Sequence, residues 1–195
     1  MLVSRYPVIL ASESPRRKEL LARLFRTFRI IPPHLDEASA IHQGEALAHF
    51  LARAKAKKVF CQHPSSLVIS ADTVVLINGE SLSKPTSEED AIEMLQRLSG
   101  RTHQVVTAVA VICPEGEISF TESTRVSFHE LSLEEIVLYV KSGEPMDKAG
   151  AYAIQGEAEK FVASISGDKD TVIGLPILRL REELLRAGWA KEEPT

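Results

Sequence analysis

The sequence has little of what marks several specialised protein classes. It has two cysteines, Cys61 and Cys113, which lie far apart in unrelated contexts. Such a pair provides neither a disulfide framework nor the ligand spacing of a zinc site. The six histidines form no HxH or HExxH pattern, which argues against a zinc enzyme. We therefore expect two buried, reduced thiols and no zinc site.

Long apolar runs and an excess of positive charge are also absent. No stretch reaches the roughly 18 to 20 apolar residues that span a bilayer, and the segment from Met1 to Pro7 lacks the layout of a signal peptide. The formal net charge is -4, so no broad basic surface is expected to attract nucleic acid. These absences predict a cytoplasmic protein that binds neither a membrane nor nucleic acid.

What the chain does contain is typical of a globular protein. Its 195 residues are 44% hydrophobic and 26% charged, which predicts one domain over residues 1–195, or two lobes that share one core. The patterns GxxxxGK[ST] and GxSxG do not occur. Neither a P-loop nor a serine nucleophile elbow is therefore expected.

Helical and β-rich segments alternate along the chain. Asn78-Gly79 separates two β-rich segments, which is a strong hairpin signal. Because helices interleave with both crossovers and hairpins, we predict the α/β class with a mixed sheet. Helices are expected at 15–26, 44–60, about 86–98, 132–143 and 177–187, and strands at 7–11, 28–31, 67–77, 81–83, 105–113, 118–128, 152–154, 161–165 and 171–173.

Three cations occupy an unfavourable place at the start of the first predicted helix. Arg16, Arg17 and Lys18 follow the expected N-cap Ser14, where the helix dipole and the free amides favour anions. A bound phosphate would reverse this, because it would accept hydrogen bonds from the amides, from the hydroxyls of Ser12 and Ser14, and from the guanidinium groups. The alternative is a set of solvated surface cations.

Asp72 is a carboxylate inside the apolar run 67–77. An unpaired buried carboxylate costs several kcal/mol, so Asp72 must meet a cation, a metal ion or hydrogen-bond donors, or lie at an opening of the sheet. An ion pair with a nearby lysine is the alternative to a functional role. Two further acids, Asp36 and Glu37, follow Pro32-Pro33-His34 in a loop, where they would by themselves be surface charges.

A polar loop punctuated by glycine, residues 144–156, precedes a short β-rich segment. Loops of this composition often carry binding groups. Gln155 offers a carboxamide that can donate to and accept from the edge of a base. A surface glutamine without a binding role is the alternative.

Several segments together resemble the motif series of the Maf family, and the resemblance runs over nearly the whole chain. It implies nucleotide pyrophosphatases with an elongated mixed β-sheet flanked by helices, in two lobes around a nucleotide cleft, similar to inosine triphosphate pyrophosphatases. The motifs are long and stand in the family's order, which makes a chance match implausible. They are Leu10-Ala-Ser-Glu-Ser-Pro-Arg-Arg-Lys-Glu-Leu-Leu21, Ala71-Asp-Thr-Val-Val75, Leu98-Ser-Gly-Arg-Thr-His103, Asp147-Lys-Ala-Gly-Ala-Tyr152 and Val172-Ile-Gly-Leu-Pro176.

The resemblance also implies a role for individual residues. The motifs resemble the branch of the family that acts on dTTP and UTP, which implies hydrolysis of these nucleoside triphosphates to the monophosphate and pyrophosphate. Mg²⁺ or Mn²⁺ would be the cofactor, because both ions prefer oxygen ligands. The resemblance implies that Ser12, Arg16 and Arg17 bind the phosphates and that Lys55 and Lys84 neutralise their charge. It implies that Glu37 and Asp72 hold the metal and the attacking water, with Asp72 as the proton acceptor. The positions implied for selectivity are Arg16, Thr73 and Gln155.

Two other functions stay open at this point. The family's older name, septum formation inhibitor, suggests a nonenzymatic nucleotide-binding regulator of cell division. A phosphatase that releases orthophosphate is the second. A homodimer is expected from the resemblance and from the general frequency of twofold oligomers.

Overall fold

The computed structural model describes residues 1–35 and 43–193. The chain forms two compact units, and three strands contribute residues to both. Each unit buries its own apolar side chains. The prediction of a single domain stays a prediction. Unit 1 consists of Met1–Asp72, Thr107–Glu122 and Gly174–Thr195, unit 2 consists of Thr73–Val106 and Ser123–Ile173, and the shared strands are β4 (Leu67–Ile77), β6 (Thr102–Cys113) and β7 (Gly116–Phe128).

The main sheet is mixed, which confirms the predicted α/β class. Its strand order is β3-β2-β4-β6-β7-β8, and β5 pairs with β4. β2 pairs in parallel with β3 and β4, whereas the β4–β5 and β7–β8 pairs are antiparallel. The strands not yet given are β2 (Val8–Leu10), β3 (Arg29–Ile30), β5 (Glu80–Leu82) and β8 (Val162–Ser166).

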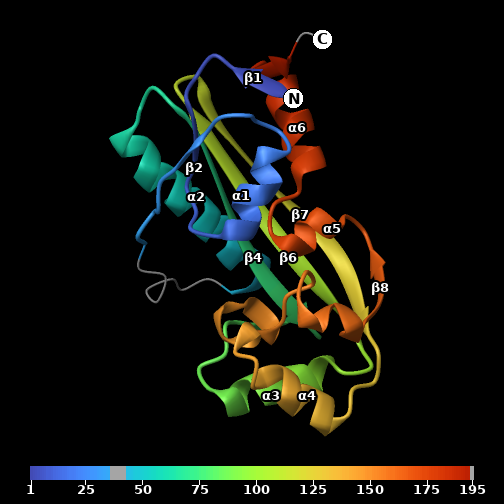
Figure 1. Cartoon of the computed structure of the whole chain (residues 1–195). Coiled ribbons are helices and arrows are strands. Elements are labelled where there is room, and N and C mark those ends of the chain that lie inside the picture. Colours follow the sequence, from blue (N-terminus) through green and yellow to red (C-terminus); the bar gives the residue numbers. More distant parts are fainter. Residues whose placement is uncertain (36–42, 194–195) are drawn as a thin grey trace. The chain divides into compact units, whose positions relative to one another are not determined.

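Unit 1 is built on a parallel β2–α1–β3 crossover. α1 (Pro15–Ala22) connects β2 to β3, and α2 (Gly44–Gln62) precedes β4 in the chain (Figure 1). A separate antiparallel pair, β1 (Leu2–Ser4) with β9 (Ala190–Glu192), ties the two ends of the chain together beside α6 (Ile177–Arg186). These two short strands were not predicted.

Two expectations about the helices of unit 1 are wrong. α1 ends at Ala22 rather than Arg26, because the amides of Arg23 and Leu24 bond to carbonyls only three residues back. For α2 the helical spacing of Leu47, Phe50, Leu51 and Ala54 predicts the buried face and places Lys55 among the solvent-facing cations. In the structure Phe50 is 43% exposed, whereas Lys55 is 8% exposed. A single ion pair, described below, explains why a lysine lies on the buried face.

Unit 2 contains two helices that lie side by side, α3 (Glu88–Leu98) and α4 (Leu133–Val140) (Figure 1). The spacing of Ser132 and Glu135 predicts a capping box at the start of α4, and the structure confirms it. Thr86 and Glu89 have the spacing of a capping box for α3, but the N-cap lies one residue later, because Ser87 accepts the bond from the Asp90 amide.

Two of the strands predicted for unit 2 do not form. Residues 171–173 belong to a short helix, α5 (Lys169–Ile173), and residues 152–154 lead into a turn. Both segments are apolar because they are buried, and burial alone does not distinguish a strand from other buried backbone. The polar loop before them forms three 3₁₀ turns, η1 (Glu144–Asp147), η2 (Ala149–Ala151) and η3 (Glu157–Phe161).

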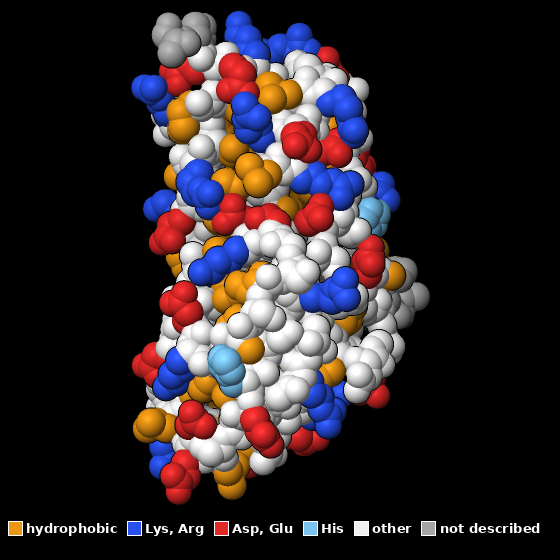
Figure 2. All heavy atoms as spheres, turned by 90° about the vertical axis from the view of Figure 1, so that its right-hand side faces the viewer, with side chains coloured by type: hydrophobic (Ala, Val, Ile, Leu, Met, Phe, Trp, Pro, Cys, Tyr) orange, Lys and Arg blue, Asp and Glu red, His pale blue; other side chains and the backbone are white. Residues whose placement is uncertain are grey.

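The surface agrees with the composition. On the face shown in Figure 2, acidic and basic side chains are interspersed rather than gathered by sign. None of the described helices is long and apolar enough to cross a membrane. Both cysteines are free, but Cys61 is exposed, so the expectation of two buried thiols holds only for Cys113.

Candidate functional site

The loop between β2 and α1 lies where parallel strands of an α/β sheet usually bind ligands, at their carboxyl ends. The Ala11 amide continues the β2–β4 ladder by donating to the Ile69 carbonyl at 2.8 Å. The chain then leaves the sheet at the buried Ser12, whose hydroxyl accepts a bond from the Ser14 amide at 3.2 Å. The hydroxyl of Ser14 in turn caps α1 by accepting from the Arg17 amide at 3.4 Å.

The first turn of α1 contains no acidic residue and three cations, as the sequence predicted. Arg17 is fixed, because its Nε donates to the Gly174 carbonyl at 2.9 Å. Arg16 is half-buried and Lys18 is exposed. The positive charge therefore stays at the positive end of the helix dipole, an arrangement that an anion would stabilise.

Lys55 and Asp72 form a buried ion pair within unit 1. Lys55 Nζ lies 2.6 Å from Asp72 Oδ1, and the two side chains are 10% and 13% exposed. Removing both charges from water costs several kcal/mol, which only their mutual attraction and further polar contacts offset. The ion pair that the sequence left open as an alternative for Asp72 is therefore present, and its partner is the lysine that the family resemblance assigns to the phosphates.

A second polar contact holds the same helix to the same strand. Ser70 Oγ donates to the Ala52 carbonyl, and both residues are buried. Residues two apart in a strand share a face, and residues three apart in a helix do so as well. Ser70 and Asp72 thus meet Ala52 and Lys55 in register, which fixes the Lys55 side chain. Sequence reasoning missed Ser70, although its spacing of two from Asp72 is the signal.

The other site candidates among the described residues belong to unit 2. Thr73 follows Asp72 directly on β4 and is half-buried, Lys84 is exposed just after β5, and Gln155 is exposed on the turn after η2. One backbone bond connects the last two regions, since the Gly150 amide donates to the Ser83 carbonyl at 3.1 Å. The segment that leads to Gln155 is therefore attached next to Lys84.

Gly150 allows this attachment. Its φ of +70° lies in the left-handed region, and a Cβ there would come within 3.0 Å of Val75. Only glycine combines this backbone conformation with so close an approach to β4. The Asp147-Lys-Ala-Gly-Ala-Tyr152 motif thus contains a glycine with a clear structural reason.

His103 is a buried histidine of unit 2 whose pKa is strongly lowered. It is 2% exposed, and Nε2 lies 2.8 Å from the hydroxyl of Tyr152. Its ring also packs edge-on against Phe128 at 5.0 Å, and Nδ1 has no hydrogen-bond partner. Burial lowers the pKa of His103 to about 4, so the ring is neutral at pH 7. Sequence reasoning assigned His103 no role beyond its place in the motif 98–103.

The expected site for Mg²⁺ or Mn²⁺ stays a prediction. Glu37, one of the two expected ligands, lies outside the described residues. Within residues 1–35 and 43–193, no three His, Cys, Asp or Glu side chains gather into a metal-binding group. Among the expected ligands, Asp72 is the one whose position is described.

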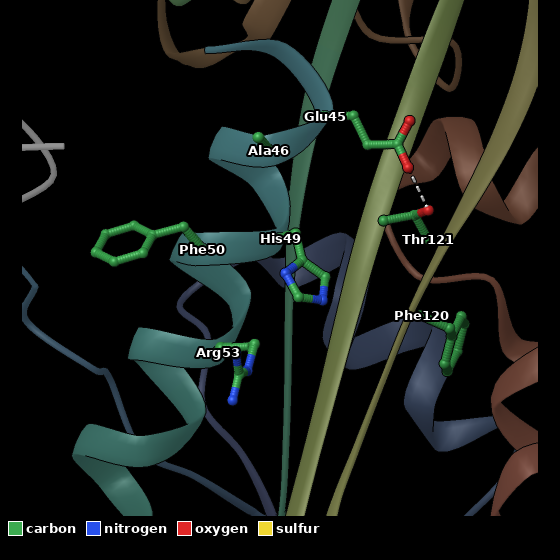
Figure 3. A pocket seen from close by; sticks show the side chains of 7 residues that line it. All are labelled: Glu45, Ala46, His49, Phe50, Arg53, Phe120 and Thr121. Carbon is green, nitrogen blue, oxygen red and sulfur yellow. Dashed lines mark hydrogen bonds between the residues drawn. The ribbon is translucent and has the colours of Figure 1, made fainter. Parts of the chain in front are cut away.

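A hollow of about 670 Å³ lies on unit 1 between α2 and β7 and contains none of the predicted site residues (Figure 3). Four residues along a helix rise about 6 Å, close to the rise of two residues along a strand. Successive turns of α2 therefore meet alternate residues of β7, in three polar contacts: Glu45 with Thr121 at 2.6 Å, His49 with Ser119 at 3.1 Å, and the ion pair of Arg53 with Glu117.

The fold resembles a known structure. The Staphylococcus aureus Ham1 protein superposes with a TM-score of 0.52, covering 93% of this chain and 99% of that chain. The sequences are 17% identical, so the likeness concerns the fold alone. It supports the mixed α/β architecture expected from the motifs.

Sequence relatives cover the chain almost completely. A dTTP/UTP pyrophosphatase of Geobacillus sp. (strain WCH70) is 49% identical over 185 residues, which are 93% of this chain and 98% of the relative. Proteins of the same name from Koribacter versatilis (strain Ellin345) and Aquifex aeolicus (strain VF5) are 47% and 45% identical, each over 93% of this chain and over 94% and 97% of their own length. The family model of Maf-like proteins matches residues 7–187. With the helix terminus, the buried ion pair and the motif loops in place, this chain belongs to the Maf family.

Proposed function

We propose that this chain is a metal-dependent nucleoside triphosphate pyrophosphatase that cleaves dTTP and UTP between the α and β phosphates. The observation that carries the proposal is the buried pair of Lys55 and Asp72 at 2.6 Å, next to the carboxyl end of a parallel strand pair. The names of the relatives, 45% to 49% identical, support hydrolysis of these two nucleotides.

The phosphate groups would be bound by the start of α1. Ser12, Arg16 and Arg17 supply hydroxyl and guanidinium donors there, and the helix dipole adds to the attraction. A triphosphate carries about four negative charges, so neutralising them is the first requirement of the reaction. The lysines that the family resemblance assigns to the phosphate charge, Lys55 on α2 and Lys84 just after β5, are the proposed source of further positive charge.

Asp72 is the proposed proton acceptor for the attacking water. A carboxylate can act as a general base when it is ionised and positioned. Lys55 supplies the compensating charge that a buried carboxylate requires, and the Ser70 bond to the Ala52 carbonyl holds strand and helix in register. Lys55 is thus assigned two roles, pairing with Asp72 and neutralising phosphate charge. Its movement from Asp72 toward a phosphate would leave the Asp72 carboxylate able to accept a proton when substrate is bound.

Mg²⁺ or Mn²⁺ fits the donor chemistry of the described residues. Mg²⁺ is commonly held by one or two carboxylates together with waters and substrate phosphates, rather than by an all-protein cage. Asp72 supplies such a carboxylate, and Glu37 is the proposed second ligand. The ion would add positive charge at the phosphate oxygens and lower the pKa of a bound water.

Base selection is assigned to unit 2. Gln155 and Thr73 are proposed to recognise thymine or uracil, because a carboxamide answers the alternating carbonyl and N-H groups of these bases. Cytosine reverses part of this pattern. Gln155 is exposed in the structure, as a residue that meets a soluble ligand must be.

The deciding experiment identifies the products. The protein is incubated with dTTP and with UTP in Mg²⁺, and pyrophosphate and orthophosphate are assayed separately. Equal amounts of monophosphate and pyrophosphate are expected. Orthophosphate as the primary product would favour the phosphatase reading, and binding without turnover would favour the nonenzymatic regulator.

Two further properties belong to this proposal. The proposed place of action is the cytoplasm, where free nucleotides are found, and the proposed assembly is a homodimer. Light scattering at several protein concentrations tests the dimer. A mass of one chain, 21.5 kDa, at every concentration would contradict it.

A further inference from the structure

Gln155 stands on a tight turn whose geometry determines where its side chain points. The turn comprises residues 153–156 and is closed by the Gly156 amide, which donates to the Ala153 carbonyl at 3.2 Å. Ile154, the second residue of the turn, is 4% exposed, whereas Gln155, the third, is exposed. The turn therefore buries one side chain as an anchor and presents the next to solvent.

A single carboxylate holds the far end of this turn. Glu144 Oε2 accepts a bond from the Glu157 amide at 3.2 Å, and Glu144 Oε1 accepts one from the Tyr139 hydroxyl at 2.8 Å. The near end is held by the same tyrosine, whose hydroxyl oxygen accepts from the Ala153 amide at 3.4 Å. Both ends of the arch over residues 153–157 thus rest on the hydrogen-bonded pair of Glu144 and Tyr139.

The pair itself has little freedom. Tyr139 is 0% exposed, and its ring packs edge-on against Phe161 at 5.2 Å. The backbone carbonyl of Glu144 accepts a bond from Lys148 Nζ at 2.7 Å. Burial and the bond to Glu144 raise the pKa of Tyr139, so its hydroxyl keeps the proton that it donates.

Gly156 shows how closely the carboxylate fits against the arch. A Cβ on Gly156 would lie 2.3 Å and 2.4 Å from the two carboxylate oxygens of Glu144. The φ of Gly156 is −132°, in the extended region, so the backbone conformation does not require glycine. A side chain at residue 156 would instead have to displace the Glu144 carboxylate from the two bonds that it accepts.

We propose that Glu144 is a positioning residue for base selection: its carboxylate holds the arch over residues 153–157 in the conformation that presents Gln155. This inference rests on the proposed role of Gln155 and deepens it. Recognition by a carboxamide requires its carrier to be held to about half an ångström, which a loop achieves only when surrounding residues lock it. Glu144 supplies that lock without contacting the base.

Glu144→Gln tests the role with the least change of shape. A carboxamide keeps one acceptor oxygen, but it places an N-H₂ group against one of the two donors that Glu144 now serves. Because a misplaced contact to the base loses roughly 1 to 3 kcal/mol, the ratio of kcat/KM for dTTP to that for CTP is expected to fall about tenfold to a hundredfold. Tyr139→Phe removes the hydroxyl and is expected to lower the same ratio. Glu134→Gln, on the exposed side of α4, is the matched control and should leave the ratio unchanged.

Gln155→Ala provides the background that separates positioning from other effects. If Glu144 acts through Gln155, adding Glu144→Gln to Gln155→Ala causes no further fall in the dTTP to CTP ratio, because coupled residues are not additive. Amide hydrogen exchange gives a readout independent of activity. Exchange at Glu157 should accelerate in Glu144→Gln and remain slow in Glu134→Gln.

Each other outcome overturns a different statement. If Gln155→Ala lowers the ratio but Glu144→Gln does not, the positioning role is wrong and the assignment of Gln155 stands. Equal losses from Glu144→Gln with and without Gln155 also overturn it, since Glu144 would then act independently. If Gln155→Ala leaves the ratio unchanged, selection lies elsewhere and the positioning role falls with it, while pyrophosphate release from dTTP still decides the proposed reaction. If exchange of the Glu157 amide is unchanged in both Glu144→Gln and Tyr139→Phe, these two side chains do not hold the arch over residues 153–157.

Discussion

Asp72 and Lys55 share one buried contact, so a change in either residue affects both stability and chemistry. Asp72→Asn is expected to lower kcat by about 10² to 10⁴, the usual cost of losing a positioned general base. It also leaves the Lys55 ammonium without its carboxylate, and breaking a buried pair in this way costs about 3 to 5 kcal/mol of unfolding free energy. Urea unfolding therefore accompanies the kinetics, which are measured at a temperature where circular dichroism shows the variant folded.

Glu117→Gln is the control for Asp72→Asn, because it removes the carboxylate of a second ion pair on the same helix. Arg53 and Glu117 are 52% and 33% exposed, and an exposed pair contributes little to stability. The activity of the Glu117→Gln variant should match that of the parent. A folded Asp72→Asn protein with the kcat of the parent would show that the proton acceptor is another group.

His103 gives a prediction about pH. Its pKa is about 4 in the folded protein, lowered by burial from the ordinary value of 6.5. Between these values the unfolded chain binds the proton and the folded chain does not, so this group destabilises the fold as pH falls from 6.5 toward 4 and has no effect above 6.5. The loss is on the order of 2 to 3 kcal/mol.

The measurement compares urea unfolding at pH 7.5 and pH 4.5 in the parent and in His103→Gln. The variant cannot titrate at this position, so its unfolding free energy should decrease less over this range than that of the parent. His129→Gln, at the exposed histidine directly after the last residue of β7, should keep the full decrease. Parallel pH profiles for the parent and His103→Gln would contradict the assignment.

At the scale of elements, the motif loop and the β4–β5 hairpin of unit 2 meet at one glycine. Gly150→Ala is expected to destabilise the protein by about 1 to 3 kcal/mol, because the new methyl group meets Val75 at 3.0 Å on a backbone that only glycine adopts easily. Gly143→Ala has nearly the same φ, +77° against +70°, but its methyl group would have no neighbour within 4 Å. Thermal unfolding of the two variants separates contact from backbone strain, and equal losses would mean that Val75 contributes nothing.

The elements also show which features a sequence determines locally. The bounds of β4 agree with the prediction because its β-rich run ends at the turn Asn78-Gly79, where both residues have positive φ. The failures at 152–154 and 171–173 have another origin. Those residues are apolar because both segments pack into the core of unit 2, and apolar character without alternation fits a strand, a short helix or a buried turn equally well.

Some residues of the candidate site follow from local sequence signals, and others depend on tertiary contacts. Ser12, Arg16 and Arg17 could be predicted from local signals, since the proline and the serine cap mark the start of α1. Lys55 could not, because the pattern of α2 placed it among the solvent-facing cations. The burial of Lys55 depends on Asp72, 17 residues away in the chain. The hydrogen bonds of Glu144 to Tyr139 and to the Glu157 amide likewise depend on contacts that sequence periodicity does not encode. Such pairings require the tertiary structure, or a family resemblance that records it.

At the scale of the whole molecule, activity should require a divalent cation. The net charge of the chain is -4, and a nucleoside triphosphate carries about four negative charges, so the rest of the protein and Asp72 repel the substrate, and the lysines and arginines at the proposed site offset only part of that repulsion. EDTA in excess is therefore expected to abolish pyrophosphate release from dTTP, and Mg²⁺ or Mn²⁺ added beyond the chelator should restore it.

The melting temperature in EDTA is the control, because the buried ion pair and the apolar cores of the described residues need no metal to form. It should stay within about a degree, since a cation bound weakly in the absence of nucleotide adds little stability. Full hydrolysis in excess chelator would remove the metal from the proposed mechanism and leave Lys55, Lys84 and the start of α1 as the groups that neutralise the phosphates.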